Sequence, residues 1–111
     1  MRLFTYADLE QPGKPAAAVH GVLRRRNERD AAARFNARAK TVVHGFLTDD
    51  YDLNKLDETE APEYSRVRVR TTGGEEVYAY EYMERDFTSL PLIPSGRFHK
   101  PKTESDKEDM K

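Results

Sequence analysis

A short acidic segment, residues 52–60, holds the side chains of this sequence that are best suited to chemistry. If the segment is helical, Leu53, Leu56 and Glu60 share one face, because residues three and four apart are neighbours on a helix. Asp57 lies beside them. Burial of the leucines would therefore carry carboxylates toward the core or into a cleft. Burial raises the pKa of a carboxyl group toward neutrality, which suits a general acid or base.

The predicted helix has signals at both ends. Acids that suit the positive end of a helix, and can cap it, precede it: Asp49, Asp50 and Asp52. Pro62 ends it, because the residue before a proline is pushed out of the helical region. The spacing alone also fits a simpler interpretation, in which Glu60 is a solvated acid at a frayed helix end. For Asp57 we expect a structural role, bonded to backbone N–H groups or to an arginine such as Arg66.

A β-hairpin is predicted directly after the helix. The stretches YSRVRVR (64–70) and EEVYAYEYM (75–83) alternate between residue classes as strands do, and TTGG joins them. Gly73 and Gly74 can supply the positive φ angles of a tight turn. On the second strand we expect three tyrosines to share one face of the sheet: Tyr78, Tyr80 and Tyr82.

The N-terminal part is predicted to contain two strands and helical structure between them. Residues 1–6 (MRLFTY) are rich in apolar and β-favouring residues, and residues 40–48 (KTVVHGFLT) are a second strand candidate. Gly45 within the latter indicates a bulge or a close backbone approach. Residues 16–40 are rich in Ala and Arg, which favours one helix with a loop or two shorter helices.

The C-terminal part is predicted to be irregular. After Met83 the sequence is apolar but interrupted by Pro91 and Pro94, which favours an extended segment draped over the sheet. Residues 101–111 are almost wholly polar and predict a disordered tail. We therefore expect one domain over residues 1–100.

The composition excludes several kinds of site. The chain has 111 residues, a formal net charge of −1 and no cysteine, so disulfides and cysteine metal sites are ruled out. The spacing of His20, His44 and His99 does not suit a zinc site. No apolar run approaches the roughly 20 residues that span a bilayer, and MRLFTYADLE lacks the long apolar segment of a secretory signal. We expect a cytoplasmic protein with no membrane partner.

Several motifs resemble those of the gamma-glutamylcyclotransferase-like (AIG2-like) family. LDETEAPEYSRVRV resembles the family's Leu-Asp-x-x-Glu-Gly segment with its following tyrosine and arginine, and the matching residues are Leu56, Asp57, Glu60, Tyr64 and Arg66. Ala61 stands in the place of the glycine. Further matches in the same order are Gly45 with Leu47, Ala79 with Tyr82, and Gly96 with Phe98. The family's opening Tyr-Gly-Ser/Thr-Leu corresponds to Tyr6, Ala7, Asp8 and Leu9, of which the first and last are kept.

The resemblance implies an α+β fold, a mixed β-barrel-like sheet with a few flanking helices. It also implies an enzyme of the lyase or acyltransferase class that works without metal or organic cofactor. In this family the α-amino group of a γ-glutamyl substrate attacks its own γ-carbonyl, which releases 5-oxoproline and an amine or amino acid. Glu60 matches the catalytic glutamate, the general acid/base. The resemblance implies that the substrate and the oxyanion are bound by Tyr6, Ala7, Asp8 and Leu9, with Tyr64 and Tyr82 as further pocket residues.

Two other functions fit particular residues. Ala7 and Asp8 depart from the family pattern, which fits a catalytically inactive cyclotransferase fold used as a binding or interaction module. Arginines in residues 24–40, with Arg66, Arg68 and Arg70, could instead track the phosphates of a nucleic acid. Aromatic residues suited to base stacking are not interleaved in the basic segment, so we favour solubility as the role of these arginines, paired with the acidic residues 49–63.

Overall fold

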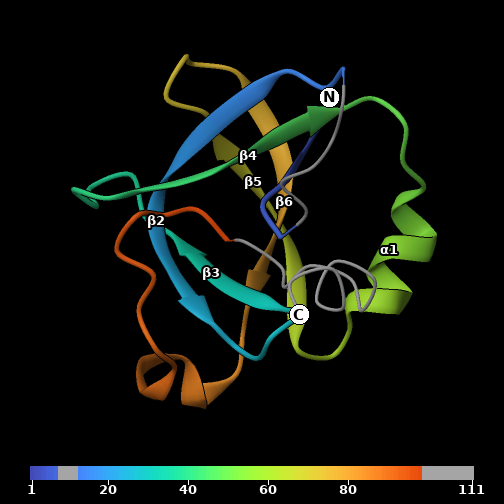
Figure 1. Ribbon diagram of the computed structural model, residues 1–111. Coiled ribbons are helices and arrows are strands. Elements are labelled where there is room, and N and C mark those ends of the chain that lie inside the picture. The colour runs from blue at the N-terminus through green and yellow to red at the C-terminus, as the bar shows by residue number, and fades with distance from the viewer. Residues whose placement is uncertain (8–12, 99–111) are drawn as a thin grey trace, which may run out of the picture.

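One curved, mixed sheet dominates the computed structural model, which describes residues 1–7 and 13–98 (Figure 1). The strand order is β3-β2-β4-β1-β6-β5; β1 pairs with β6 in parallel and all other paired strands are antiparallel. The strands are β1 (Leu3–Thr5), β2 (Ala16–Arg25), β3 (Ala31–Phe35), β4 (Val42–Thr48), β5 (Tyr64–Arg70) and β6 (Glu76–Tyr82). In the described part of the chain, α1 (Leu53–Glu60) and the 3₁₀ helix η1 (Arg85–Ser89) are the helices. The predicted mixed, barrel-like sheet is confirmed.

Side chains, rather than a further strand ladder, join the two ends of the sheet into a nearly closed barrel. The backbone N–H of Phe35 in β3 donates to Glu81 Oε2 in β6 at 2.9 Å. The hydroxyl of Tyr64 in β5 donates to the carbonyl of Ala31 in β3 at 2.6 Å. These bonds satisfy backbone groups at the edge of β3 that would otherwise lack partners.

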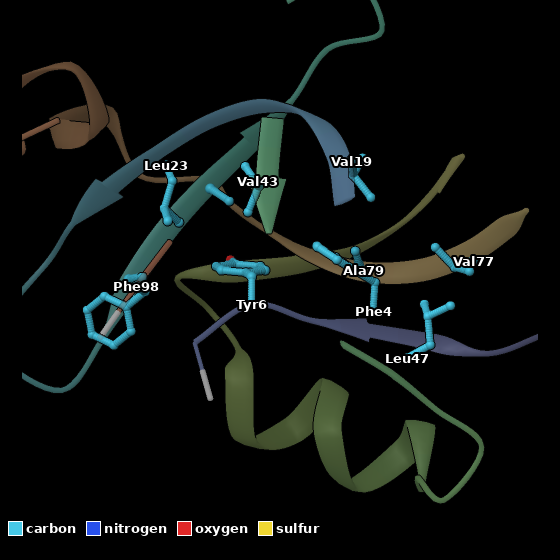
Figure 2. Close-up of a cluster of buried hydrophobic side chains, with 11 residues drawn as sticks. Phe4, Tyr6, Val19, Leu23, Val43, Leu47, Val77, Ala79 and Phe98 are labelled. Atoms are coloured by element: carbon cyan, nitrogen blue, oxygen red, sulfur yellow. The ribbon is translucent and has the colours of Figure 1, made fainter. Parts of the chain in front are cut away.

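The core lies inside this barrel, and α1 lies outside it (Figures 1 and 2). Phe4, Val43, Val77, Ala79 and Phe98 are at most 1% exposed. They come from three neighbouring strands, β4, β1 and β6, and from the C-terminal segment. All eight residues of α1 are at least partly exposed.

Two glycines meet backbone requirements that other residues would not. A Cβ on Gly45 would lie 2.1 Å from the carbonyl oxygen of Thr5 in β1, so the predicted close approach is confirmed. In the hairpin loop, Gly74 has a φ of +96°, whereas Gly73 does not have a positive φ. The prediction that both glycines supply positive φ angles is therefore wrong for Gly73. The hairpin itself, the helix and the strands near residues 1–6 and 40–48 are confirmed.

The predicted helices in residues 16–40 are wrong, because this region forms the antiparallel hairpin of β2 and β3. Val19, Gly21 and Leu23 are buried at every second position along β2, a period that fits a strand and not a helix. Alanines 31–33 are also buried. The high helix propensity of Ala and Arg is a weak preference, which pairing with β4 and burial in the barrel override.

The C-terminal segment is extended as predicted, except where η1 forms, but it lies beside β2 and pairs with its backbone instead of covering the sheet. Ile93 N–H donates to the carbonyl of Leu23 at 2.9 Å, and Arg25 N–H donates to that of Pro91 at 2.8 Å. The predicted tail at residues 101–111 lies outside the described residues. Within the described part of the chain, no helix is long and apolar enough to cross a membrane.

Candidate functional site

A cavity of about 280 Å³ lies where the barrel meets α1. Its lining comes from β1 and the two residues that follow, from the β2–β3 turn, from α1, and from β5 and β6. The volume is close to the lower end of the roughly 300–1,000 Å³ typical of small-molecule sites. Glu60 and Asp30 are carboxylates of this lining, and Arg29 is its guanidinium.

The helix α1 delivers Glu60 to the cavity. Asp52 caps its N-terminus by accepting a hydrogen bond from Lys55 N–H at 3.2 Å, as an aspartate there was predicted to do. Leu56 and Glu60 share the inward face and both line the cavity. The structure therefore places the leucine and the acid side by side, as the three- and four-residue spacing indicates.

The surroundings of Glu60 favour its protonated form. Partial burial raises the pKa of the Glu60 carboxyl, and the negative charges of Asp30 and Glu63 raise it further. The nearby guanidinium of Arg26 acts in the opposite direction. A carboxyl group with a raised pKa can both accept and return a proton near neutral pH.

Of the four residues predicted from the first loop, Tyr6 and Ala7 line the cavity, and Asp8 and Leu9 lie outside the described residues. The Tyr6 hydroxyl donates to the carbonyl of Tyr80 at 2.7 Å. Burial raises the pKa of Tyr6 well above its usual value, so this hydroxyl stays neutral. Ala7 has no positive φ, so this residue fits in the place of a glycine without left-handed strain.

Tyr64 and Tyr82 lie in different places relative to the cavity. Tyr64 lines it, and burial raises the pKa of its hydroxyl to about 12. Tyr82 is outside the lining and packs with Phe87 in a second apolar cluster. Its hydroxyl donates to Asp86 Oδ1 at 2.7 Å. The structure thus brings Tyr64 close to the cavity and directs Tyr82 elsewhere.

Tyr80 lines the cavity although we did not predict it as a site residue. Its hydroxyl donates to Asp57 Oδ1 at 2.6 Å, and Asp57 Oδ2 lies 3.6 Å from the guanidinium of Arg66, the contact predicted for Asp57. The alternation of β6 places Tyr78, Tyr80 and Tyr82 on one face of the sheet. Which of them lines the cavity depends on the register of the strands, which the sequence does not show. Arg29 and Asp30 were also missed, because their segment was interpreted as helical.

Two arginines of residues 24–40, Arg24 and Arg34, hold the C-terminal segment against the barrel. Arg24 donates to the carbonyl of Leu90 at 2.8 Å, and Arg34 donates to that of Glu84 at 2.8 Å. Both guanidinium groups also lie over the ring of Phe87. These two arginines contact backbone carbonyls and an aromatic ring of residues 84–90. Arg26, by contrast, interacts electrostatically with Glu60 and Glu63 of the acidic residues 49–63. These contacts do not test nucleic-acid binding, which stays the less favoured of the two sequence-based interpretations of these arginines.

Metal ligands do not cluster in the described part of the chain. No group of three or more His, Asp or Glu side chains there could hold a metal ion. The cavity offers hydroxyl, carboxyl and guanidinium groups together with apolar walls.

Comparisons with known proteins show the fold and the family of this chain. This chain is similar in structure to an uncharacterized protein, PH0828 from Pyrococcus horikoshii, with a TM-score of 0.62 and 14% sequence identity. The superposition covers 99% of this chain and 95% of that chain, which shows a common fold. Among curated protein sequences, none matches. The family model described as gamma-glutamyl cyclotransferase, AIG2-like, matches residues 4–100. The chain therefore belongs to the AIG2-like gamma-glutamyl cyclotransferase family.

Proposed function

We propose that this protein is a cyclotransferase that releases 5-oxoproline and an amine or amino acid from a small γ-glutamyl substrate, with Glu60 as the general acid/base. Family membership supports cyclotransferase-type function in general. The observation that carries the specific proposal is the position of Glu60, half-buried at the cavity with a raised pKa.

The reaction is an intramolecular aminolysis. The substrate's α-nitrogen forms a bond to its own γ-carbonyl carbon, and the bond from that carbon to the leaving nitrogen breaks. Starting from the free amine, the attacking nitrogen must lose one proton and the leaving nitrogen must gain one. Glu60 accepts a proton from the first and returns it to the second, so a single carboxyl group serves both steps. No oxidant or co-reactant is required, because nucleophile and electrophile belong to one substrate.

Ring closure places negative charge on the carbonyl oxygen. Backbone N–H groups of residues 6–9 are the proposed donors to this oxyanion, and Tyr6 and Ala7 of this segment line the cavity opposite α1. The bond from Tyr6 to the Tyr80 carbonyl ties this segment to β6. A donor fixed in this way needs little reorganisation during the reaction.

Release of 5-oxoproline from a panel of γ-glutamyl amines and γ-glutamyl amino acids tests the proposal. Glu60→Gln keeps the shape of the side chain but removes its acid/base function, so turnover should fall about 10²–10⁴-fold. Glu58→Gln, the same change at an exposed position of α1, is the matched control and should leave turnover unchanged. Glu60→Gln with wild-type turnover would show that Glu60 is not the acid/base.

If the wild-type protein releases no 5-oxoproline from any member of the panel, the proposed reaction is wrong for these substrates. Calorimetric binding of the same compounds would then favour the inactive, ligand-binding alternative. Release that depends on Glu60 would exclude that alternative.

A further inference from the structure

The helix that carries the proposed acid is lightly held by apolar packing. Every residue of α1 is at least partly exposed, and its inward leucines, Leu53 and Leu56, are only half-buried. In Figure 2 the helix lies outside the barrel, away from the buried side chains of the core. Apolar burial alone therefore does little to fix the distance between Glu60 and the opposite wall of the cavity.

A hydrogen bond from the barrel reaches α1 one turn before Glu60. Tyr80 is a buried residue, 8% exposed, and its hydroxyl donates to Asp57 Oδ1 at 2.6 Å. A short bond to a carboxylate is among the stronger hydrogen bonds in proteins. Asp57 and Glu60 are three residues apart, so the bond holds the same helix face that carries the acid.

The backbone carbonyl of Tyr80 contacts the part of the cavity wall that carries Tyr6. This carbonyl accepts a hydrogen bond from the hydroxyl of Tyr6 at 2.7 Å, and Tyr6 is the first residue of the segment that carries the proposed oxyanion donors. One residue of β6 is therefore bonded to both parts of the site, to Asp57 in α1 through its side chain and to Tyr6 through its main chain.

We propose that Tyr80 is a positioning residue, which holds α1, and with it Glu60, at a set distance from the cavity wall that carries Tyr6. Tyr80 is not assigned as the acid, because its hydroxyl proton is already donated to Asp57. Its effect on turnover rests on the proposed function, whereas its effect on the ionisation of Glu60 can be measured without substrate.

The test is a titration of the Glu60 carboxyl carbon by NMR, assigned by its loss in Glu60→Gln, in wild type and in Tyr80→Phe. Without the hydroxyl, α1 is expected to move outward and Glu60 to become hydrated, so its raised pKa should fall toward the usual value. The charges that face Glu60, namely Asp30, Glu63 and Arg26, are unchanged in this variant. Tyr78→Phe, the same change two residues away on β6, is the control and should titrate like wild type.

A pair of changes in Asp57 separates positioning from a general loss of stability. Asp57→Asn keeps an oxygen that can accept the Tyr80 hydroxyl and should retain the wild-type titration of Glu60. Asp57→Ala removes the acceptor and also the Arg66 contact, so it should lower the pKa of Glu60 at least as far as Tyr80→Phe does, and adding Tyr80→Phe to it should have no further effect. Identical Glu60 titration in wild type, Tyr80→Phe and Asp57→Ala would overturn the positioning role, as would independent effects in the double variant.

If the cyclotransferase reaction is confirmed, Tyr80→Phe should lower kcat by about 10–100-fold and change KM less, because small misplacements of a reacting group are costly. The acid limb of its pH–rate profile should shift to lower pH, together with the titration of Glu60. Absence of turnover in wild type, with the NMR shift present, would refute the proposed function and leave the positioning role standing. Unchanged kcat in Tyr80→Phe would refute its role in turnover.

Discussion

Two elements that line the cavity, β1 and α1, are held in place by different means. β1 has three residues, of which Leu3 is 4% and Phe4 is 1% exposed, and it pairs with both β4 and β6. α1 has eight residues, all at least partly exposed, and is tied to the barrel through Asp57, which accepts the Tyr80 hydroxyl and lies 3.6 Å from the Arg66 guanidinium. The shorter element is therefore the better fixed of the two.

The difference indicates that the stability of the barrel depends mainly on β1, whereas the proposed acid/base function depends on α1. Buried aromatic side chains on β1 remove much apolar surface from water, which stabilises the barrel. The carboxyl group of Glu60 is on the lightly packed side, where partial burial disfavours its charged form. Changes on β1 should therefore act mainly on folding, and changes on α1 mainly on turnover.

The largest effect on stability is expected from Phe4→Ala. The ring of Phe4 packs against those of Tyr6 and Phe35, with centroids 6.3 and 6.2 Å apart, and its removal leaves a cavity in the core. The free energy of unfolding should fall by about 3–5 kcal/mol, measured by urea denaturation. Phe4→Leu, which fills more of the space, should cost clearly less. Equal costs would show that the ring packing of β1 is not what holds this wall.

A smaller loss is expected from Asp52→Ala, which removes the N-terminal cap of α1. The free energy of unfolding should fall by about 0.5–2 kcal/mol, because one backbone N–H of the first turn loses its acceptor. Turnover of a γ-glutamyl substrate should fall as the helix frays. Asp50→Ala, at an exposed position outside the helix, is the control. A stability loss as large as that of Phe4→Ala would contradict the contrast between the two elements.

The smallest effect is expected from Glu60→Gln on stability, and it has the opposite sign. Burial raises the pKa of Glu60 in the folded chain, so this group stabilises the fold below its unfolded pKa and loses that contribution as pH rises through the folded value. Near pH 8 the neutral glutamine should therefore raise Tm by a few degrees at most relative to wild type. At about pH 4, where the carboxyl group is mostly protonated in both states, this gain in Tm should vanish. Thermal melts at both pH values measure this. A gain that does not depend on pH would show that the charged carboxylate is not disfavoured.

Local signals were sufficient for α1 and for the β5–β6 hairpin. The acids before Leu53 and the proline at position 62 mark the helix ends through side-chain capping and backbone sterics, which act within a few residues. The alternation of YSRVRVR predicts a strand for the same reason. By contrast, residues 16–40 were misassigned because helix propensity contributes only a few tenths of a kcal/mol per residue, less than the burial and pairing gained in a sheet.

The site divides in the same way. The sequence by itself determined that Leu56 and Glu60 share a helix face, and it was enough for recognition of the family's motifs. Only the tertiary structure decided that Tyr80, and not Tyr82, lines the cavity, that Arg29 and Asp30 reach it, and that Asp57 accepts the hydroxyl of Tyr80. Helix periodicity is a local property of the chain. The neighbours of a strand residue, however, depend on register and curvature across the whole sheet, which no short segment contains.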